Sequence, residues 1–319
     1  MNSKAILKIL RQHKTFLIST HVNPDADALC SELVLALFLK SLGKKVLIVN
    51  EDKMPSMYQA IPRKELIQKM NSPAIDYDVA IVVDCGDLAR IGNVKKVIQN
   101  DRPIVNIDHH ITNDFFGQFN LIQDKASSTA EVIYGLVKEA GFRLTKDIAI
   151  LLYLGIMTDT GSFRYDNTSS QTHAVVSDLL KFGFSVSQWY RTIYENISSK
   201  DFEMFNQVLR DVELVQDDRV ASLVLRKKTV QWFSKDFDLR DKIFSSIRSI
   251  KEVQVVAIYT EVNKHETRVN FRSKGKMNVA RLAARYGGGG HRRASGCWLR
   301  EGFRTVKRKI SKELRKLLK

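Results

Sequence analysis

Short apolar runs alternate with longer helical stretches along the first half of the chain. Four aliphatic runs have the length of buried strands, and they cover residues 16–20, 45–49, 79–83 and 104–107. Helical patterning lies at 29–42, 128–140 and 147–158, and glycine directly follows the first two stretches, where helices commonly end. This alternation predicts an α/β fold in which a parallel sheet carries helices on both faces.

The pattern changes after residue 183. A linking helix is expected at 186–199, followed by hairpin-like strand pairs at 212–226 and 254–272. The remaining chain predicts a helix, a glycine run, a short strand and a terminal amphipathic helix, which indicates a second, smaller α+β domain. We therefore expect a first domain at 1–186, a linker helix at 187–205 and a second domain at 206–319.

Composition agrees with two domains. The chain has 319 residues and is 44% apolar, so it can bury a core and is longer than one typical domain. Its formal net charge of +16 favours a polyanionic partner, such as nucleotides or short nucleic acids. Part of this charge lies in the terminal helix, which is either a docked amphipathic helix with a solvated basic face or a direct contact for substrate.

Two further features bear on where the protein works. No apolar run reaches the roughly 18 residues that a membrane span requires, and the first ten residues mix lysines into an amphipathic pattern. The cysteines are Cys30, Cys85 and Cys297, which lack the spacing of a zinc knuckle and cannot all be paired as disulfides. We expect a cytoplasmic protein with no membrane association.

Acidic residues and histidines stand where predicted elements end. His21, Asp25 and Asp27 follow the first strand, and Asp84 follows the strand at 79–83. Asp108, His109 and His110 follow the next strand, and Asp159 ends a helical stretch. Some positions also have an ordinary structural explanation: Asp27 could cap a helix, and Asp84 could pair with Arg90 or cap a helix. Ligands in open α/β sheets bind beyond the carboxyl ends of the strands, so the shared placement favours a binding site.

Gathered carboxylates repel one another unless a cation lies between them. Because four consecutive element ends carry Asp or His, a shared metal cluster is the better explanation. Carboxylates with a few imidazoles suit Mn²⁺, with Mg²⁺ or Co²⁺ as alternatives. Two such ions can activate water for phosphoryl displacement without a protein nucleophile. Ser128 is interpreted instead as a helix N-cap whose capping-box partner is Glu131.

These segments together resemble the DHH phosphoesterase superfamily, and within it the DHH-DHHA1 group that contains nanoRNases and pAp phosphatases. Residues 21–31, 84–90, 108–113 and 159–165 are similar to the four motifs of the first domain. Residues 270–273 and 287–296 are similar to the substrate-binding elements of the second. The resemblance covers nearly the whole chain. Cys30 stands where the family usually has glycine or alanine, and its small size predicts no loss of activity.

The resemblance implies two Mn²⁺ ions. One would be held by His21, Asp25 and Asp84, and the other by Asp27, Asp84, His109 and Asp159, so that Asp84 is the bridge. Asp108 would orient His109 or lie behind the metals, and His110 would contact the substrate phosphate and assist proton transfer. In the second domain the substrate-binding residues would be Arg272, Ser273, Gly288, Gly289, Gly290 and His291, although a glycine run can also be a flexible turn.

The implied activity is hydrolysis of short oligoribonucleotides to mononucleotides and of 3′-phosphoadenosine 5′-phosphate (pAp) to AMP. Phosphodiesterase action on linear or cyclic dinucleotides, such as pApA or cyclic di-AMP, is an alternative that uses the same metals. A non-catalytic nucleic-acid binder is the alternative from another class. Relatives of this kind often dimerise through the first domain, so a homodimer is expected from the resemblance.

Overall fold

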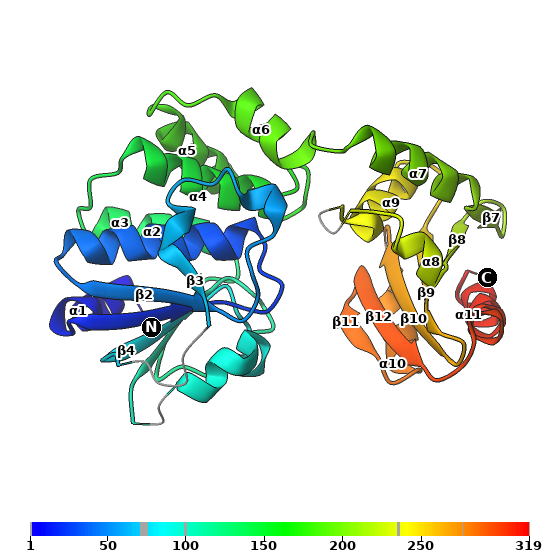
Figure 1. Ribbon diagram of the computed structural model, residues 1–319, viewed down its shortest axis with the longest axis horizontal. Helices are drawn as coiled ribbons and strands as arrows, with labels where there is room; N and C mark the ends of the chain where they lie inside the picture. The colour runs from blue at the N-terminus through cyan, green and yellow to red at the C-terminus, as the bar shows by residue number, and fades with distance from the viewer. Residues whose placement is uncertain (1, 71–75, 99–100, 235–236, 276, 319) are drawn as a thin grey trace. The chain divides into compact units, whose positions relative to one another are not determined.

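The chain forms two compact units in the computed structural model, which describes residues 2–70, 76–98, 101–234, 237–275 and 277–318 (Figure 1). The units are Met1–Asn196 and Ile197–Lys319, and each has its own sheet and core. Among the described residues, no helix combines the length and apolar character needed to cross a membrane.

A six-stranded sheet of parallel strands organises the first unit, in the order β3-β2-β1-β4-β5-β6. The strands are β1 (Thr15–Ser19), β2 (Lys45–Asn50), β3 (Ile67–Lys69), β4 (Val79–Val83), β5 (Ile104–Asp108) and β6 (Phe119–Ile122). The order reverses between β1 and β4, and this reversal opens a crevice at the carboxyl ends of those strands. The predicted parallel α/β sheet is confirmed. The four predicted strands are β1, β2, β4 and β5, whereas the edge strands β3 and β6 were not predicted.

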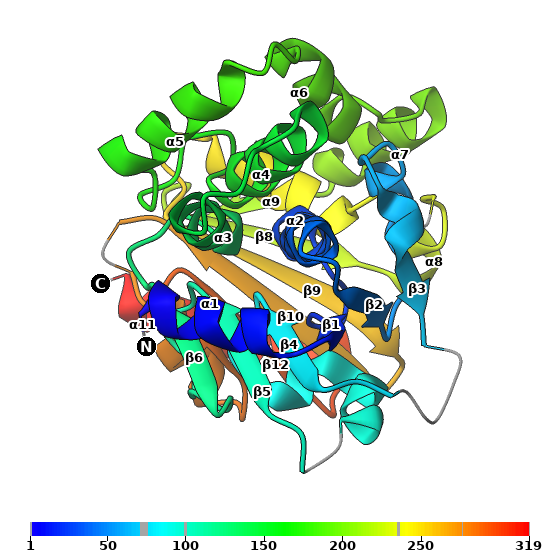
Figure 2. The same cartoon turned by 90° about the vertical axis from the view of Figure 1, so that its left-hand side faces the viewer.

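Side chains of β4 alternate between two apolar cores. Ile81 and Val83 pack with helices α2, α3 and α4, whereas Ala80 and Val82 pack with the 3₁₀ segment η3 (Leu88–Val97). Figure 2 shows α2, α3 and α4 lying together on one side of the sheet. The helices of this unit are α1 (Ser3–Gln12), α2 (Ala26–Ser41), α3 (Thr129–Glu139), α4 (Lys146–Asp159), α5 (Ser170–Leu180) and α6 (Val186–Tyr194), with short 3₁₀ turns η1 (Ser56–Tyr58) and η2 (Lys64–Leu66).

One suggested helix cap, Asp27, and one predicted capping-box partner, Glu131, are corrected. Asp25, not Asp27, is the N-cap of α2, because its Oδ1 accepts from the backbone N–H of Ala28 at 3.1 Å. Ser128 is the N-cap of α3, as predicted. The Glu131 carboxylate does not complete a capping box with Ser128, because it accepts from the backbone and hydroxyl of Ser127 and from the hydroxyl of Thr172.

The expected linking helix at 186–199 is two helices. α6 ends at Tyr194 and α7 (Ser199–Arg210) begins after a break, with Ser198 as its N-cap. The first unit ends at Asn196, so α6 belongs to the first unit and α7 to the second. The sequence Ser198–Asp201 explains the new start, since the Ser198 hydroxyl accepts from the backbone N–H of Asp201 at 3.0 Å.

The second unit is built on a mixed sheet in the order β11-β12-β10-β9-β8-β7. Among the described strands of this sheet, β8 and β9 alone pair in parallel, and the other pairs are antiparallel. The strands are β7 (Glu213–Val215), β8 (Val220–Leu225), β9 (Val255–Asn263), β10 (Glu266–Ser273), β11 (Gly289–His291) and β12 (Ala294–Leu299). Both predicted hairpin pairs are present, as β7–β8 and β9–β10.

Helices cover both faces of this second sheet. α7 and α9 (Leu239–Arg248) pack on one face through Phe205 and Ile243, and α10 (Val279–Ala284) and α11 (Phe303–Leu317) pack on the other through Leu282 and Ile310. A short helix, α8 (Lys227–Val230), follows β8. The second α+β domain is confirmed, including its terminal amphipathic helix.

Candidate metal centre

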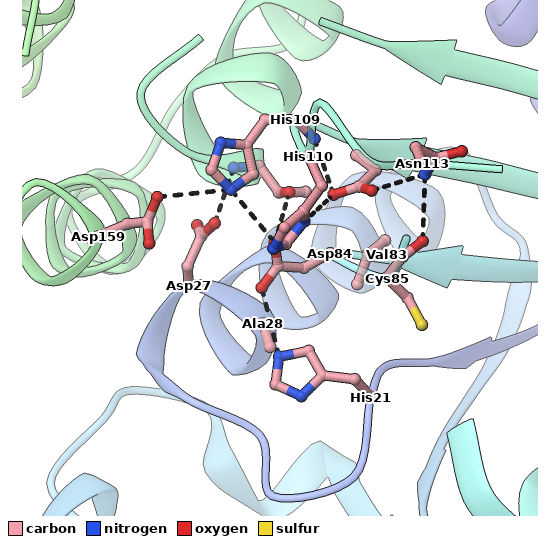
Figure 3. Close-up of polar contacts among 12 residues, drawn as sticks. His21, Asp27, Ala28, Val83, Asp84, Cys85, His109, His110, Asn113 and Asp159 are labelled. Atoms are coloured by element: carbon pink, nitrogen blue, oxygen red, sulfur yellow. Dashed lines mark hydrogen bonds and ion pairs between the residues drawn. The ribbon is translucent and has the colours of Figure 1, made fainter. Parts of the chain in front are cut away.

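The loops that follow β1 and β4 bring His21 and Asp84 together (Figure 3). The Nδ1 of His21 lies 2.9 Å from the Val22 carbonyl oxygen, which can only accept, so Nδ1 carries the proton. This leaves the lone pair of Nε2, 3.6 Å from Asp84 Oδ2, available to a metal. Asp84 has a left-handed backbone with φ 53°, and only 2% of the residue is exposed. The strained turn places its carboxylate in the crevice between β1 and β4.

Asp27 lies in the first turn of α2 and meets the start of α3. Its Oδ2 accepts from the backbone N–H of Thr129 at 2.7 Å, and its Oδ1 accepts from that of Ala130 at 2.9 Å. The N-terminus of α3 therefore holds the carboxylate in place. The Thr129 hydroxyl also donates to Asp84 Oδ1 at 2.9 Å, so one helix start orients two carboxylates.

Gly155 permits the close packing around Asp27. A Cβ at Gly155 would lie 2.6 Å from the Cβ of Ala130 and 2.8 Å from Asp27 Oδ1. Any larger residue would push α4 away from α2 and α3. At the end of α4 stands Asp159, whose Oδ2 is 3.4 Å from His109 Nε2.

The triplet Asp108-His109-His110 begins at the last residue of β5, and its two histidine rings contact different partners. His109 lies with Nδ1 3.3 Å from the Ala126 carbonyl oxygen, which leaves Nε2 facing Asp84 and Asp159. His110 instead donates from Nδ1 to Asp108 Oδ1 at 2.7 Å. The two rings are therefore held in different orientations although they are neighbours in sequence.

Asp108 is saturated by protein hydrogen bonds. Its Oδ1 accepts from His110 and from the backbone N–H of His109 at 2.8 Å, and its Oδ2 accepts from Asn113 Nδ2 at 2.6 Å. The residue is fully buried. This arrangement suits a residue that orients His110 better than one that binds a metal directly.

Like charges crowd this site. Burial, with the charges of Asp84 and Asp159, raises the pKa of Asp27 well above its ordinary value, and burial raises the pKa of Asp159 to about 7. Burial would also raise the pKa of Asp84, but hydrogen bonding to His21 and the charges of His109 and His110 lower it instead. Burial lowers and the Asp108 hydrogen bond raises the pKa of His110, with a net rise to about 9. Bound cations would relieve the repulsion among the carboxylates.

The ligand atoms form three sets among the described residues, and the set of Asp84, Asp108, His109 and His110 shares one residue with each of the other two. His21, Asp25 and Asp84 have ligand atoms within 4.8 Å of one another, as do Asp27, His109 and Asp159. Asp84 belongs to the set with His21 and Asp25, and its Oδ1 lies 3.7 Å from His109 Nε2 of the set with Asp27 and Asp159. Oxygen donors with imidazoles, and no thiolate, are a donor set that hard divalent cations accept.

The alternative explanations for these residues do not account for their contacts. Asp84 is surrounded by His21, His109 and His110, and no ion pair joins it to Arg90 among the described residues. Arg90 supports the loop through its carbonyl oxygen, which accepts from the backbone N–H of Val22 at 2.7 Å.

Three residues at this site were missed in the sequence: Thr129, Asn113 and Gly155. Asn113 lies at the end of the third motif, and Thr129 follows the predicted cap Ser128, so both had a local signal. Gly155 had none, because a glycine inside an apolar helix shows its purpose only when the neighbouring helices are in place.

The predicted substrate-binding residues gather at one end of the second sheet. The glycine run forms the edge strand β11 rather than a flexible turn, and it pairs with β12. A Cβ at Gly288 would overlap the Gly296 carbonyl oxygen, whereas a Cβ at Gly289 would meet nothing within 4 Å. Gly290 has φ +129°, and a Cβ there would lie 2.6 Å from the Ala294 carbonyl oxygen. The side chain of His291 lies outside the described residues.

Arg272 and Ser273 end β10, which is separated from β11 by β12, and they make contacts of their own. The Arg272 guanidinium carbon lies 4.8 Å from the centre of the Phe244 ring. The Ser273 hydroxyl, in a residue only 2% exposed, donates to the Met277 carbonyl oxygen at 2.9 Å. Ser273 therefore braces the turn before α10, and its role toward substrate stays a prediction.

Known proteins match this chain in sequence and in fold. The models of the DHH family N-terminal domain and of the DHHA1 domain match residues 15–156 and 231–319. A protein of Streptococcus mutans named probable bifunctional oligoribonuclease and PAP phosphatase NrnA is 31% identical over 92% of each chain. A crystal structure of an exopolyphosphatase-related protein from Bacteroides fragilis superposes with a TM-score of 0.88, 25% identity and coverage of 99% of this chain and 97% of that one.

A crystal structure of the exonuclease RecJ bound to manganese shares the fold at a TM-score of 0.52 and 14% identity, covering 97% of this chain and 93% of that one. The alignment with the S. mutans protein spans almost the full length of both chains. The two family models match the two units in chain order. The chain therefore belongs to the DHH family of phosphoesterases, with a DHH domain followed by a DHHA1 domain.

Proposed function

We propose that this protein is a metal-dependent phosphoesterase that hydrolyses short oligoribonucleotides to mononucleotides and pAp to AMP. The observation that carries the proposal is the convergence on Asp84 of His21 from one loop and His109 from another, beside Asp27 and Asp159. The oligoribonuclease and PAP phosphatase names of relatives across nearly the whole chain support the substrates.

Two ions are proposed at this site. His21, Asp25 and Asp84 would hold one, and Asp27, Asp84, His109 and Asp159 would hold the other. Bound divalent ions would activate a water molecule and neutralise charge on the phosphoryl group. Mn²⁺ is our choice of ion, supported by the mixed carboxylate and imidazole donors and by the manganese in the RecJ structure, with Mg²⁺ or Co²⁺ as alternatives.

His110 would act on the substrate phosphate. Burial lowers the pKa of His110, but the Asp108 hydrogen bond and the neighbouring carboxylates raise it to about 9 in the absence of bound cations. Asp108 keeps Nδ1 occupied and sets the direction of the ring. In the second unit, Arg272, Ser273, the strand Gly289–His291 and Gly288 are proposed to bind the nucleotide. We retain 187–205 as the proposed linker between the domains, and a homodimer as the proposed assembly.

A metal-and-substrate matrix on the purified full chain tests this function. Mn²⁺ should support release of AMP from a diadenylate and from pAp, and EDTA should abolish both reactions. Asp84→Asn should lower the rate by at least about 10³-fold, or about 4 kcal/mol, because both proposed ion sites lose a ligand. Asp124→Asn, at an exposed carboxylate, is the matched control and should keep the wild-type rate.

Three results would redirect the proposal. An unchanged rate in Asp84→Asn would remove the bridging role of Asp84. A clear preference for cyclic di-AMP over both other substrates would favour the dinucleotide phosphodiesterase. Tight RNA binding without turnover under every metal would favour the non-catalytic binder.

A further inference from the structure

An open pocket of about 690 Å³ lies in the second unit. Its walls come from the end of α7, from β7 and β8, from α8 and from the first half of α11. β7 and β11 are opposite edges of the same six-stranded sheet (Figure 1). Because residues of β7 and β8 line the pocket, it lies at the other edge of the sheet from the glycine strand. It is separate from the proposed substrate-binding residues of β10 and β11.

Positive charge dominates the walls of this pocket. Five cationic side chains line it against two carboxylates, those of Asp211 and Glu213. The cations are Arg210, Arg226, Arg304, Lys307 and Arg308. Lys307 is neutralised by Glu213, with its Nζ 2.7 Å from the carboxylate. Within the part of the chain that the structure describes, Arg210, Arg304 and Arg308 form no ion pair.

The pocket also has a flat and partly apolar wall. The Arg226 guanidinium carbon lies 3.8 Å from the centre of the Phe303 ring, and Val212 and Val224 line the pocket nearby. Stacking of this kind fixes the plane of an arginine while its edge N–H groups remain available to phosphate oxygens. Arg226 also lies 3.7 Å from Glu261, a long ion pair that leaves it about half exposed.

The start of α11 adds to the positive potential. Gly302 caps this 15-residue helix without a side-chain hydrogen bond, and its first turn contains no acid. Arg304 lies in that first turn, where a cation opposes the helix dipole. The buried face of α11, with Val306 and Ile310, packs in the core, so packing sets the position of the helix. Lys307 is paired with Glu213, but Arg304 and Arg308 form no ion pair among the described residues. An anion in the pocket would satisfy both the helix start and the arginines.

We propose that this pocket binds the phosphate groups of nucleotides as a second site on the protein. Its volume suits a nucleotide, and planar arginines beside an aromatic ring suit phosphate together with an adjoining base or sugar. A free nucleoside polyphosphate and a stretch of oligoribonucleotide backbone both carry this chemistry. The residues that line the pocket include none of the metal-centre residues and none of the proposed substrate-binding residues.

Binding measurements on the full chain test the site, with EDTA present to prevent turnover. The probes are ATP with a fluorescent group on its ribose and a 5′-phosphorylated hexaadenylate. The double variant Arg304→Glu/Arg308→Glu should bind at least about tenfold more weakly than wild type, because two phosphate contacts become repulsive. Arg304→Gln alone should weaken binding about threefold, and it covers the case in which the double variant fails to fold.

The matched control is Lys312→Glu/Arg315→Glu, which makes the same change in net charge on exposed residues of α11 outside the pocket. It should change affinity by less than about threefold. A selective loss for ATP identifies a free nucleotide as the ligand, and a selective loss for hexaadenylate identifies the RNA backbone. Equal weakening in both double variants, or no binding of either probe to wild type, would overturn the proposal.

Discussion

The two units handle electrical charge in opposite ways. The first gathers negative side chains from distant parts of the chain and buries them: Asp27 is hydrogen bonded to residues 102 and 103 positions away, and Asp84 to one 45 positions away. The second places its cations on exposed helix ends and builds its glycine edge from a hairpin that is local in sequence. A buried cluster of one sign needs a counter-ion, whereas exposed charge is already hydrated. The first unit should therefore respond to metal and pH, and the second mainly to backbone fit.

The largest expected difference between the two units is the effect of bound metal on their stability. At 100 to 1,000 times its Kd, Mn²⁺ should raise the free energy of unfolding of the first unit by about 2.7 to 4.1 kcal/mol, because it binds only the folded site. Hydrogen exchange should slow in β4 and remain unchanged in β9. Asp84→Asn should abolish the gain and Asp124→Asn should keep it. Equal protection of both sheets would show that the metal dependence is not confined to the buried carboxylates.

Adding a single methyl group at Gly288 should lower the stability of the second unit and leave that of the first unit unchanged. Gly288→Ala is expected to cost about 3 kcal/mol in the second unit, because the new Cβ would overlap the Gly296 carbonyl and lie 2.7 Å from the Cα of Cys297. Gly289→Ala makes the same chemical change in open space and should cost less than about 1 kcal/mol. Denaturant unfolding and exchange of β12 amides measure both. If the two variants were equally stable, β11 would not be held by close contact.

Glu32 tests whether a buried carboxyl group outside the proposed metal ligands also makes the stability of the first unit depend on pH. The residue is fully buried in α2, one oxygen accepts from Asn50 Nδ2 at 2.8 Å, and the other has no partner among the described residues. Burial raises the pKa of Glu32 to about 8. Between its unfolded and folded pKa values the folded protein holds a proton that the unfolded chain has lost, so stability falls as pH rises.

In EDTA, wild type should lose about 2 kcal/mol more than Glu32→Gln when pH is raised from about 5.5 to about 7.5. Gln cannot ionise and keeps the hydrogen bond to Asn50, so the variant lacks this loss. Glu65→Gln, at an exposed site, should follow wild type. Parallel pH curves for wild type and Glu32→Gln would show that Glu32 is already ionised at the lower pH.

Local sequence was enough to locate the strand ends and the residues that follow them. Apolar runs bounded by polar residues placed β1, β4 and β5, and the acids directly after them were recognised because parallel strands end at one edge of a sheet. The residue that caps each helix was harder to predict from local sequence. Asp25 and Asp27 stand two residues apart and both suit a cap, and the choice depends on Thr129 and Ala130, which bind Asp27 instead.

By itself, the sequence determined the two-domain α/β and α+β arrangement, the order of the motifs and the kinds of donor atom, since these depend on residue type and local spacing. The tertiary structure decided which nitrogen of each histidine faces the carboxylates, that Asp108 is occupied by His110 and Asn113, and that Gly155 must be small. It also gathered the arginines of α7 and α11 and Arg226, which directly follows β8, around one pocket. These features join elements far apart in the chain, and their geometry is set by the packing of helices on a sheet, which no local pattern encodes.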